Sequence, residues 1–256
     1  MTEQVSAHGS SHISAFELAQ QRLIVALDLP TADAALELAS TLKDQCQWFK
    51  VGLELYIAAG PSIVEKLVSR GHSIFLDLKL HDIPNTVASA VRSASSLGAS
   101  MLTIHAAGGP AMLAAARDAA ASMAAPPQLL AVTVLTSMDP SQLEATGVSD
   151  APHEQVARLA KLGLDAGING FVCSPQEVAA LRALVGKDGV LVTPGIRPTG
   201  ADKGDQQRIA TPTLALEQGA NYLVVGRPIT QAADPALAAE AILMEIAEAL
   251  AIAPTE

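Results

Sequence analysis

Three charged residues in one short segment are the strongest chemical signal in this sequence. Asp77, Lys79 and Asp82 fall within SIFLDLKL (73–80) and the HDIPNT that follows it, in an otherwise apolar stretch. Because alternate residues of an extended strand share a face, Asp77 and Lys79 are expected to point the same way, whereas Asp82 lies beyond the strand. Carboxylates close to a buried lysine keep it protonated. The segment therefore predicts an ammonium ion held as a proton donor, with a purely structural salt bridge as the alternative.

Two further charged residues interrupt or end apolar runs. Lys50 lies within WFKVG (48–52), and its apolar neighbours argue against a lysine that merely extends along the surface. We expect Lys50 to reach the same pocket as Lys79. Asp28 ends LIVALD (23–28), where a site residue and a cap for the next helix are equally good explanations.

Glycine and arginine near the end of the chain form a candidate phosphate site. TPG (193–195) and VGR (225–227) each place a glycine where a strand is predicted to end, so that backbone amides can approach an anion. Arg227 would supply the charge, and a glycine followed by arginine at a strand end favours this role over that of a surface arginine.

The segment between these two motifs is unusual for a connector. PGIRPTGADKGDQQRI (194–209) is long, polar and rich in glycine, and is predicted to be a lid that closes over substrate. Gln206 is a candidate contact from this lid. Arg197 either anchors the lid or forms a surface ion pair.

The histidines and cysteines carry no motif of their own. His105 is interpreted as a hydrogen-bonded structural residue, because no HxH or HExxH spacing accompanies it. Cys46 and Cys173 lie far apart without a CxxC pairing, so we expect buried, unreactive thiols in a reducing compartment. No metal site is predicted.

Short apolar runs alternate with segments of helical length, which predicts parallel βαβ units. The runs are LIVALD (23–28), WFKVG (48–52), SIFLDLKL (73–80), MLTIHA (101–106), LLAVTVLT (129–136), GFVCS (170–174), VLVTPG (190–195) and NYLVVG (221–226). Eight such units predict an α/β fold of one (β/α)8 TIM barrel, with the site at the carboxyl ends of the strands. An open doubly wound sheet is disfavoured, because the first turn, DLPTAD, lacks GxGxxG.

Length and composition agree with one barrel domain. The chain has 256 residues, typical of a (β/α)8 barrel. We expect a flexible N-terminal tail over 1–14, a short helix over 16–22 and a barrel over 15–256. The formal net charge of −10 argues against nucleic-acid binding. No basic, apolar leader or membrane-length apolar run is present, so a cytoplasmic location without membrane contact is expected.

Taken together, these motifs resemble the orotidine 5'-monophosphate decarboxylase family. FLDLKLHDIPNTV is similar to the family's DxKxxD signature with its following IPNT. The other matching motifs are ALD, FKVG, LTSMD, TPGIRP, GDQQRI and VVGRPIT, in order from about residue 23 to residue 235. The resemblance implies a cofactor-free carboxy-lyase that converts orotidine 5'-monophosphate to uridine 5'-monophosphate in pyrimidine biosynthesis.

The resemblance also implies roles for individual residues. Lys79 would protonate the carbanion at C6 and Asp77 would sit beside the departing carboxylate, with Lys50 completing the charge array. A homodimer is implied, with Asp82 and Thr86 contributed across its interface. The implied substrate-binding residues are Asp28, Lys50, Asp77, Ile83, Thr86, Thr136, Pro194, Arg197, Gln206, Gly226 and Arg227.

Two other functions remain open at this point. The magnesium-dependent 3-keto-gulonate 6-phosphate decarboxylases and hexulose phosphate synthases resemble this family and share DxKxxD, but carry an acidic metal ligand at the position of Lys50. A lysine there favours the metal-free nucleotide enzyme. A non-catalytic phosphate-binding barrel is a more remote alternative, disfavoured by the intact charge array.

Overall fold

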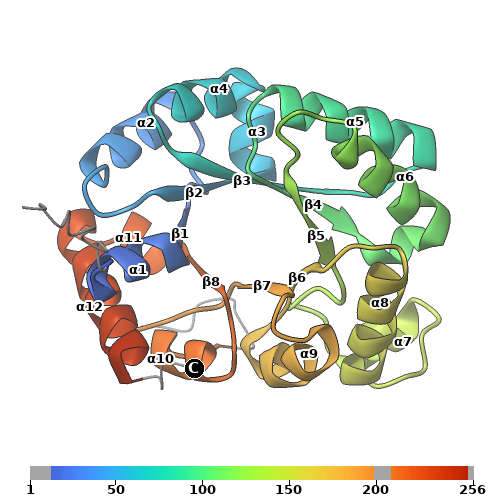
Figure 1. Cartoon of the computed structure of the whole chain (residues 1–256). Coiled ribbons are helices and arrows are strands. Elements are labelled where there is room, and N and C mark those ends of the chain that lie inside the picture. The colour runs from blue at the N-terminus through green and yellow to red at the C-terminus, as the bar shows by residue number, and fades with distance from the viewer. Residues whose placement is uncertain (1–12, 199–208, 253–256) are drawn as a thin grey trace, which may run out of the picture.

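Eight parallel strands, hydrogen-bonded in sequence order and closed by the pairing of β1 with β8, form a barrel in the computed structural model (Figure 1). The structure describes residues 13–198 and 209–252. The strands are β1 (Leu23–Ala26), β2 (Trp48–Gly52), β3 (Ser73–Leu80), β4 (Met101–His105), β5 (Gln128–Val132), β6 (Gly170–Val172), β7 (Val190–Thr193) and β8 (Tyr222–Val225). The predicted (β/α)8 barrel is confirmed, and the open doubly wound sheet is wrong.

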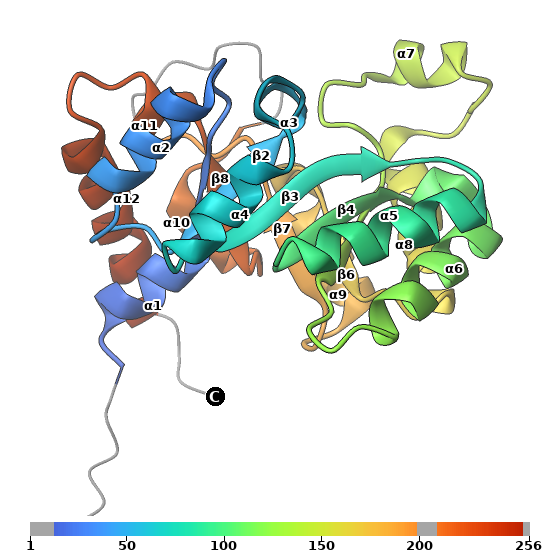
Figure 2. The same ribbon diagram turned by 90° about the horizontal axis from the view of Figure 1, so that it is seen from above.

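Each predicted apolar run contains one strand. The fifth run was predicted to continue to residue 136, but β5 ends at Val132, and Thr136 lies in a turn. The chain leaves the barrel there, and this segment leads to α7, which stands apart from the ring of helices (Figure 2). A site residue that follows a strand is thus carried on a loop at the barrel mouth.

Helices surround the barrel between successive strands (Figure 1). The helices are α1 (Ala15–Arg22), α2 (Ala32–Thr41), α3 (Leu53–Ala59), α4 (Ser62–Ser69), α5 (Pro84–Ser96), α6 (Gly109–Ala121), α7 (Pro140–Ala145), α8 (Pro152–Asp165), α9 (Val178–Val185), α10 (Pro212–Glu217), α11 (Arg227–Thr230) and α12 (Pro235–Ile252), with short 3-10 turns at Ala106–Gly108 and Pro175–Glu177. The short helix predicted over 16–22 is confirmed as α1. Proline begins several helices, where its missing N–H costs no hydrogen bond.

The apolar residues separate into two packed layers. Alternate strand residues point inward, where Ile24, Phe75, Met101, Leu130 and Val224 belong to a cluster that fills the barrel. Their neighbours along each strand pack outward against the helices in a larger cluster. Each fully buried side chain of this size contributes about 1.5–3 kcal/mol. The rigid scaffold that results holds the strand ends in place.

The turns that precede strands are the places where glycine is required by conformation. Gly71 and Gly98, just ahead of β3 and β4, have φ values of 87° and 83°, as their positions in the sequence predict. Gly189, which directly precedes β7, has no positive φ, and the turn there is made at Gly186, whose φ is 69°.

No helix in the described part of the chain is both long enough and apolar enough to cross a bilayer. The predicted tail, 1–14, lies outside the described residues apart from Ile13 and Ser14. Ser14 caps α1, where its hydroxyl accepts the Glu17 N–H and the Glu17 carboxylate accepts the Ser14 N–H. The extent of the tail therefore stays a prediction.

Candidate active site

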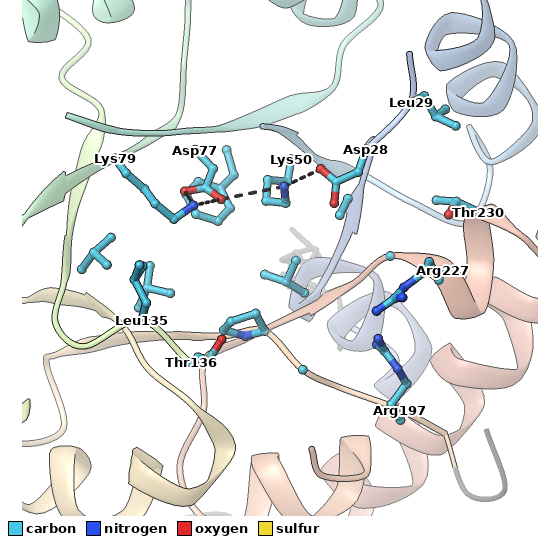
Figure 3. Close-up of a pocket in the computed structure, with 18 of the residues that line it drawn as sticks. Asp28, Leu29, Lys50, Asp77, Lys79, Leu135, Thr136, Arg197, Arg227 and Thr230 are labelled. Carbon is cyan, nitrogen blue, oxygen red and sulfur yellow. Dashed lines mark hydrogen bonds and ion pairs between the residues drawn. The ribbon is translucent and has the colours of Figure 1, made fainter. Parts of the chain in front are cut away.

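A cavity of about 500 Å³ opens at the carboxyl ends of the strands (Figure 3). This is the end of a (β/α)8 barrel at which active sites form. It is lined by nine of the residues singled out from the sequence, namely Asp28, Lys50, Asp77, Lys79, Thr136, Pro194, Arg197, Gly226 and Arg227. Residues from six strands and their following loops therefore meet in one place.

Four charged side chains form a row of alternating sign along one wall (Figure 3). Lys50 Nζ donates to Asp28 Oδ1 at 2.8 Å and lies 3.8 Å from Asp77 Oδ2. Lys79 Nζ lies 2.8 Å from both carboxylate oxygens of Asp77. The Lys50 and Asp77 side chains are only 11% and 13% exposed, so little solvent screens their attraction. The row orients two ammonium groups from two directions toward one carboxylate.

The sequence left two explanations for Asp28, a helix cap or a site residue, and two for Lys50, a surface or a pocket lysine. Thr31, and not Asp28, caps α2, since its side chain accepts the Ala34 N–H. Lys50 is nearly buried and faces the cavity, so it is not a surface lysine. Gly52 leaves room for the pair, because a Cβ on it would lie 2.8 Å from Lys50 Nζ.

The backbone at the end of β3 departs from a regular strand. Leu76 pairs with Leu102 of β4, but the next pair joins Leu80 to Ile104, so the register shifts by two residues. Lys79 has a φ of 51°, the only positive value at a non-glycine residue among those described. This left-handed conformation costs about 1–2 kcal/mol. Asp77 and Lys79 meet as predicted, yet through an irregular turn and not through simple strand alternation.

Thr103 is a site residue that the sequence analysis missed. It lies on β4, on the same inward face as Met101, and is fully buried. Its Oγ1 accepts the Lys79 N–H at 2.8 Å and donates to Asp77 Oδ1 at 3.0 Å. A threonine inside the apolar run MLTIHA was the available signal, but threonine is also common in strands.

The opposite wall carries the candidate phosphate site. The guanidinium groups of Arg197 and Arg227 lie on the same side of the cavity and point toward one another (Figure 3). Arg197 is only 6% exposed and donates its backbone N–H to Ala210 O, so it does not lie at the surface. Gly195, with a φ of 80°, lets the chain turn at the rim. This wall therefore places two guanidinium groups and the backbone at Gly195 next to the cavity.

The charges that line the cavity do not balance. Four cationic side chains, two lysines and two arginines, face two aspartates, which gives a formal charge of +2 for these residues. The whole chain carries −10. A small anion is therefore attracted to this cavity specifically, whereas a long polyanion would be repelled by the rest of the surface.

Three predicted residues do not line the cavity of this chain. β3 ends at Leu80 and α5 begins at Pro84, which leaves Asp82 and Ile83 exposed in the connecting turn and Thr86 exposed in the first turn of α5. The Asp82 carboxylate accepts the Ile83 N–H at 2.6 Å and forms no ion pair with Lys79. Within one chain Asp82 therefore does not pair with Lys79, in agreement with its predicted place beyond the strand.

Gln206 and residues 199–208 of the predicted lid lie outside the described residues. The ends of that segment are joined, since Ile196 and Ala210 form a parallel bridge. The prediction of a lid is neither supported nor opposed by these contacts.

His105 is the last residue of β4 and is not among the residues that line the cavity. Its ring packs against that of His81, with centroids 5.3 Å apart. Burial lowers the pKa of His105, and the nearby positive groups of His81 and Lys79 lower it further. The neutral form is therefore favoured, in agreement with a structural role.

No group of three or more His, Cys, Asp or Glu side chains within residues 13–198 and 209–252 is placed to hold a metal ion. Cys46 and Cys173 are buried free thiols as predicted, and burial raises the pKa of each to about 12.

The sequence did not single out several residues that also line the cavity. They are Leu29, Leu135, Thr230, Gln231 and Val134, together with the strand residues Ala26, Phe75, Val132, Val172 and Val224.

Comparison with known proteins gives one consistent result. Residues 21–242 match the family model described as Orotidine 5'-phosphate decarboxylase / HUMPS family. A protein from Nitrosococcus oceani named orotidine 5'-phosphate decarboxylase is 54% identical over 228 residues, which cover 89% of this chain and 98% of that protein. A protein of the same name from Moorella thermoacetica is 51% identical over 234 residues, which cover 89% of this chain and 93% of that protein.

A solved structure agrees with these matches. The crystal structure of orotidine 5'-phosphate decarboxylase from Lactobacillus acidophilus has a TM-score of 0.79 to this chain and 41% sequence identity. The similarity covers 88% of this chain and 99% of that structure. The likeness therefore extends over the barrel and is not confined to the motifs at the strand ends.

Proposed function

The chain belongs to the orotidine 5'-phosphate decarboxylase / HUMPS family, and from this membership we propose how its cavity carries out the reaction. The chain is a carboxy-lyase that converts orotidine 5'-monophosphate to uridine 5'-monophosphate in pyrimidine biosynthesis. The observation that carries the mechanism is the contact of the Lys79 ammonium with both oxygens of Asp77, next to a cavity with excess positive charge.

Lys79 is proposed as the proton donor. When the bond between C6 and the carboxylate breaks, carbon dioxide leaves and the electron pair stays on C6 of the pyrimidine ring. An ammonium group fixed beside C6 stabilises this charge electrostatically and then transfers a proton to the carbon. A proton from solvent later restores the lysine.

Asp77 is proposed to lie beside the substrate's own carboxylate. Two carboxylates at close range repel one another, and this repulsion is lost when carbon dioxide departs. Asp77 also holds Lys79 in place at 2.8 Å before the reaction begins. The same aspartate thus raises the energy of the bound substrate and orients the proton donor.

The remaining cavity residues are proposed to bind the rest of the nucleotide. Asp28 and Lys50 lie at the end of the charge row and suit the ribose hydroxyls, which both donate and accept hydrogen bonds. Thr136 faces the row across the cavity, near the expected place of the pyrimidine (Figure 3). The phosphate is assigned to Arg227, Gly226 and Arg197, with Pro194 at the rim. Gln206, which lies outside the described residues, is proposed as a further contact.

A homodimer is part of the proposal. Asp82, Ile83 and Thr86 are exposed and do not line their own cavity, so they are available to complete the cavity of a second copy. Ile83 is a large apolar side chain that is 67% exposed, which favours burial against a partner. A cytoplasmic location is also proposed, in keeping with the two free thiols.

The magnesium-dependent sugar-phosphate enzymes that share DxKxxD are the second candidate. The Lys50 ammonium stands between the Asp28 and Asp77 carboxylates, where it supplies the positive charge that a divalent cation would bring. This favours the cofactor-free reaction. The names of the relatives that are 50–54% identical point the same way.

One spectrophotometric assay tests the proposal. Purified chain is incubated with orotidine 5'-monophosphate, with and without EDTA, and the loss of substrate absorbance is followed. Equal rates in both arms are expected. Activity that disappears on chelation and returns with magnesium would indicate a magnesium-dependent site like that of the sugar-phosphate enzymes, and absence of turnover in both arms would overturn the assignment of orotidine 5'-monophosphate as the substrate.

A further inference from the structure

We propose that Thr103 is a positioning residue whose hydroxyl holds Asp77 and Lys79 in their reactive arrangement. The proposal rests on the proposed function, because it assigns Thr103 a task only if Lys79 delivers the proton. Thr103 is not among the residues that line the cavity. It would act through the two charged residues on the neighbouring strand.

The backbone supplies the first reason. Between the pairs Leu76–Leu102 and Leu80–Ile104, three residues of β3 face one residue of β4, and that residue is Thr103. A parallel strand pair would normally satisfy the Lys79 N–H through a backbone carbonyl. At this shift the Thr103 hydroxyl accepts it instead, at 2.8 Å. The side chain therefore supports the left-handed conformation of Lys79, whose φ is 51°.

The direction of the hydrogen bonds supplies the second reason. A backbone N–H can only donate, so the Thr103 oxygen must accept from Lys79 and its single proton is free for another partner. That partner is Asp77 Oδ1 at 3.0 Å. Asp77 in turn accepts from the Lys79 ammonium at 2.8 Å. The backbone of Lys79, the hydroxyl, the carboxylate and the ammonium therefore form one closed ring of contacts.

Burial makes this ring rigid. Thr103 has no exposed surface, and its β-branched side chain has restricted rotation about χ1. Loss of the hydroxyl would leave a buried N–H and one carboxylate oxygen without this partner. Asp77 could then rotate and the turn at Lys79 could relax, which would displace the ammonium from the reacting carbon. A misplacement of about 1 Å can cost on the order of 100-fold in rate.

The experiment compares Thr103→Val with Thr103→Ser. Valine keeps the shape and removes the hydroxyl, whereas serine keeps the hydroxyl. Thr133 offers a matched control, because it is also a buried threonine, directly after β5, and its Oγ1 has no hydrogen-bond partner among the described residues. Thr133→Val therefore makes the same chemical change where no hydrogen bond is lost.

We expect Thr103→Val to lower kcat by roughly 10- to 100-fold, with the Kd for uridine 5'-monophosphate changed by less than about threefold. Thr103→Ser should recover kcat to within about threefold of the unaltered chain, and Thr133→Val should leave it unchanged. All rates are measured well below the melting temperature of each variant, so that a loss of stability alone does not lower them.

Two results would overturn the proposal. One is a folded Thr103→Val variant with kcat within about twofold of the unaltered chain. The other is a Thr103→Ser variant as slow as Thr103→Val, which would assign the effect to side-chain shape. If Thr103→Val does not fold, Thr103→Ala against Thr103→Ser decides by the same criteria. Failure of the proposed function itself would appear differently, as undiminished turnover in Lys79→Ala.

Discussion

The Nζ atom of Lys79 lies 2.8 Å from each of the two carboxylate oxygens of Asp77, although only one residue separates them in the chain. This contact fixes a positive charge at the cavity wall before any substrate is present. A preorganised charge requires no rearrangement when charge develops on the substrate. The relationship gives the site its chemistry, and four predictions follow from it and from its surroundings.

Removal of the Lys79 ammonium should stop turnover but not binding. Lys79→Ala loses both the proton donor and the charge that stabilises the carbanion, so kcat should fall by at least about 10⁴-fold. Calorimetric binding of uridine 5'-monophosphate should persist, because the phosphate contacts remain. Lys161→Ala, an exposed lysine on α8, serves as the control for loss of a charge. Near-normal turnover in Lys79→Ala would refute the mechanism.

Removal of the Arg227 guanidinium should act mainly on affinity. A hydrogen bond to a charged group contributes about 1.5–3 kcal/mol, so Arg227→Ala should raise KM by roughly 10- to 100-fold with a smaller change in kcat. The nucleoside orotidine, which lacks the phosphate, provides the internal control. Its kcat/KM should be the same for both proteins. An equal loss with the nucleoside would show that Arg227 serves some other part of the reaction.

Mixed dimers test whether Asp82 serves a second subunit. Lys79→Ala and Asp82→Asn are each expected to be nearly inactive alone. If Asp82 acts across an interface, a heterodimer of the two has one site with both changes and one unaltered site. An equal mixture after subunit exchange should therefore recover roughly a quarter of full activity. No recovery, with exchange verified by mass spectrometry, would place Asp82 in its own subunit or outside the reaction.

The half-buried histidine at the end of β4 should make stability depend on pH. The pKa of His105 is lowered in the folded state, chiefly by burial, so the unfolded chain binds this proton more readily. Stability is therefore full above the unfolded pKa of about 6.5 and declines as the pH falls below it. His105→Gln should flatten the pH dependence of the urea-unfolding free energy between about pH 5 and 7.

His72 provides a check on that prediction. Its pKa is also lowered by burial and by Arg70, and its ring packs edge-on against Phe49, with centroids 4.8 Å apart. His105→Gln should thus remove only part of the pH dependence, and His72→Gln should remove a further part. A slope that is unaltered in both single variants would show that neither histidine titrates differently on folding.

Much of the architecture could be predicted from local patterns. Eight apolar runs with helical segments between them are sufficient to predict a barrel, because parallel strands must be joined by crossovers. The strands of such a barrel all end at the same face. Polar residues at strand ends, such as Lys50 and Arg227, could therefore be assigned to one cavity from the sequence alone.

The details of the site depended on contacts between distant residues. From the sequence, a helix cap and a site residue were equally good explanations for Asp28, and its contact with Lys50 favours the second. Asp82 lies beyond the strand as predicted, but only the structure shows that it is exposed in the turn and forms no ion pair with Lys79 of its own chain. No sequence pattern distinguished Thr103 from an ordinary strand threonine. Each of these outcomes depends on which side chains meet across separate strands.

What the sequence determined by itself is therefore the order of the elements and the identity of the chemical groups at the barrel mouth. Only the tertiary structure decided their alignment, in which a two-residue shift between β3 and β4 places Thr103 against both Asp77 and Lys79. The physical reason is that strand periodicity specifies the face on which a side chain lies. A shift of two residues keeps every side chain on its face, so the pattern cannot distinguish it, and packing and hydrogen bonding across the sheet decide it.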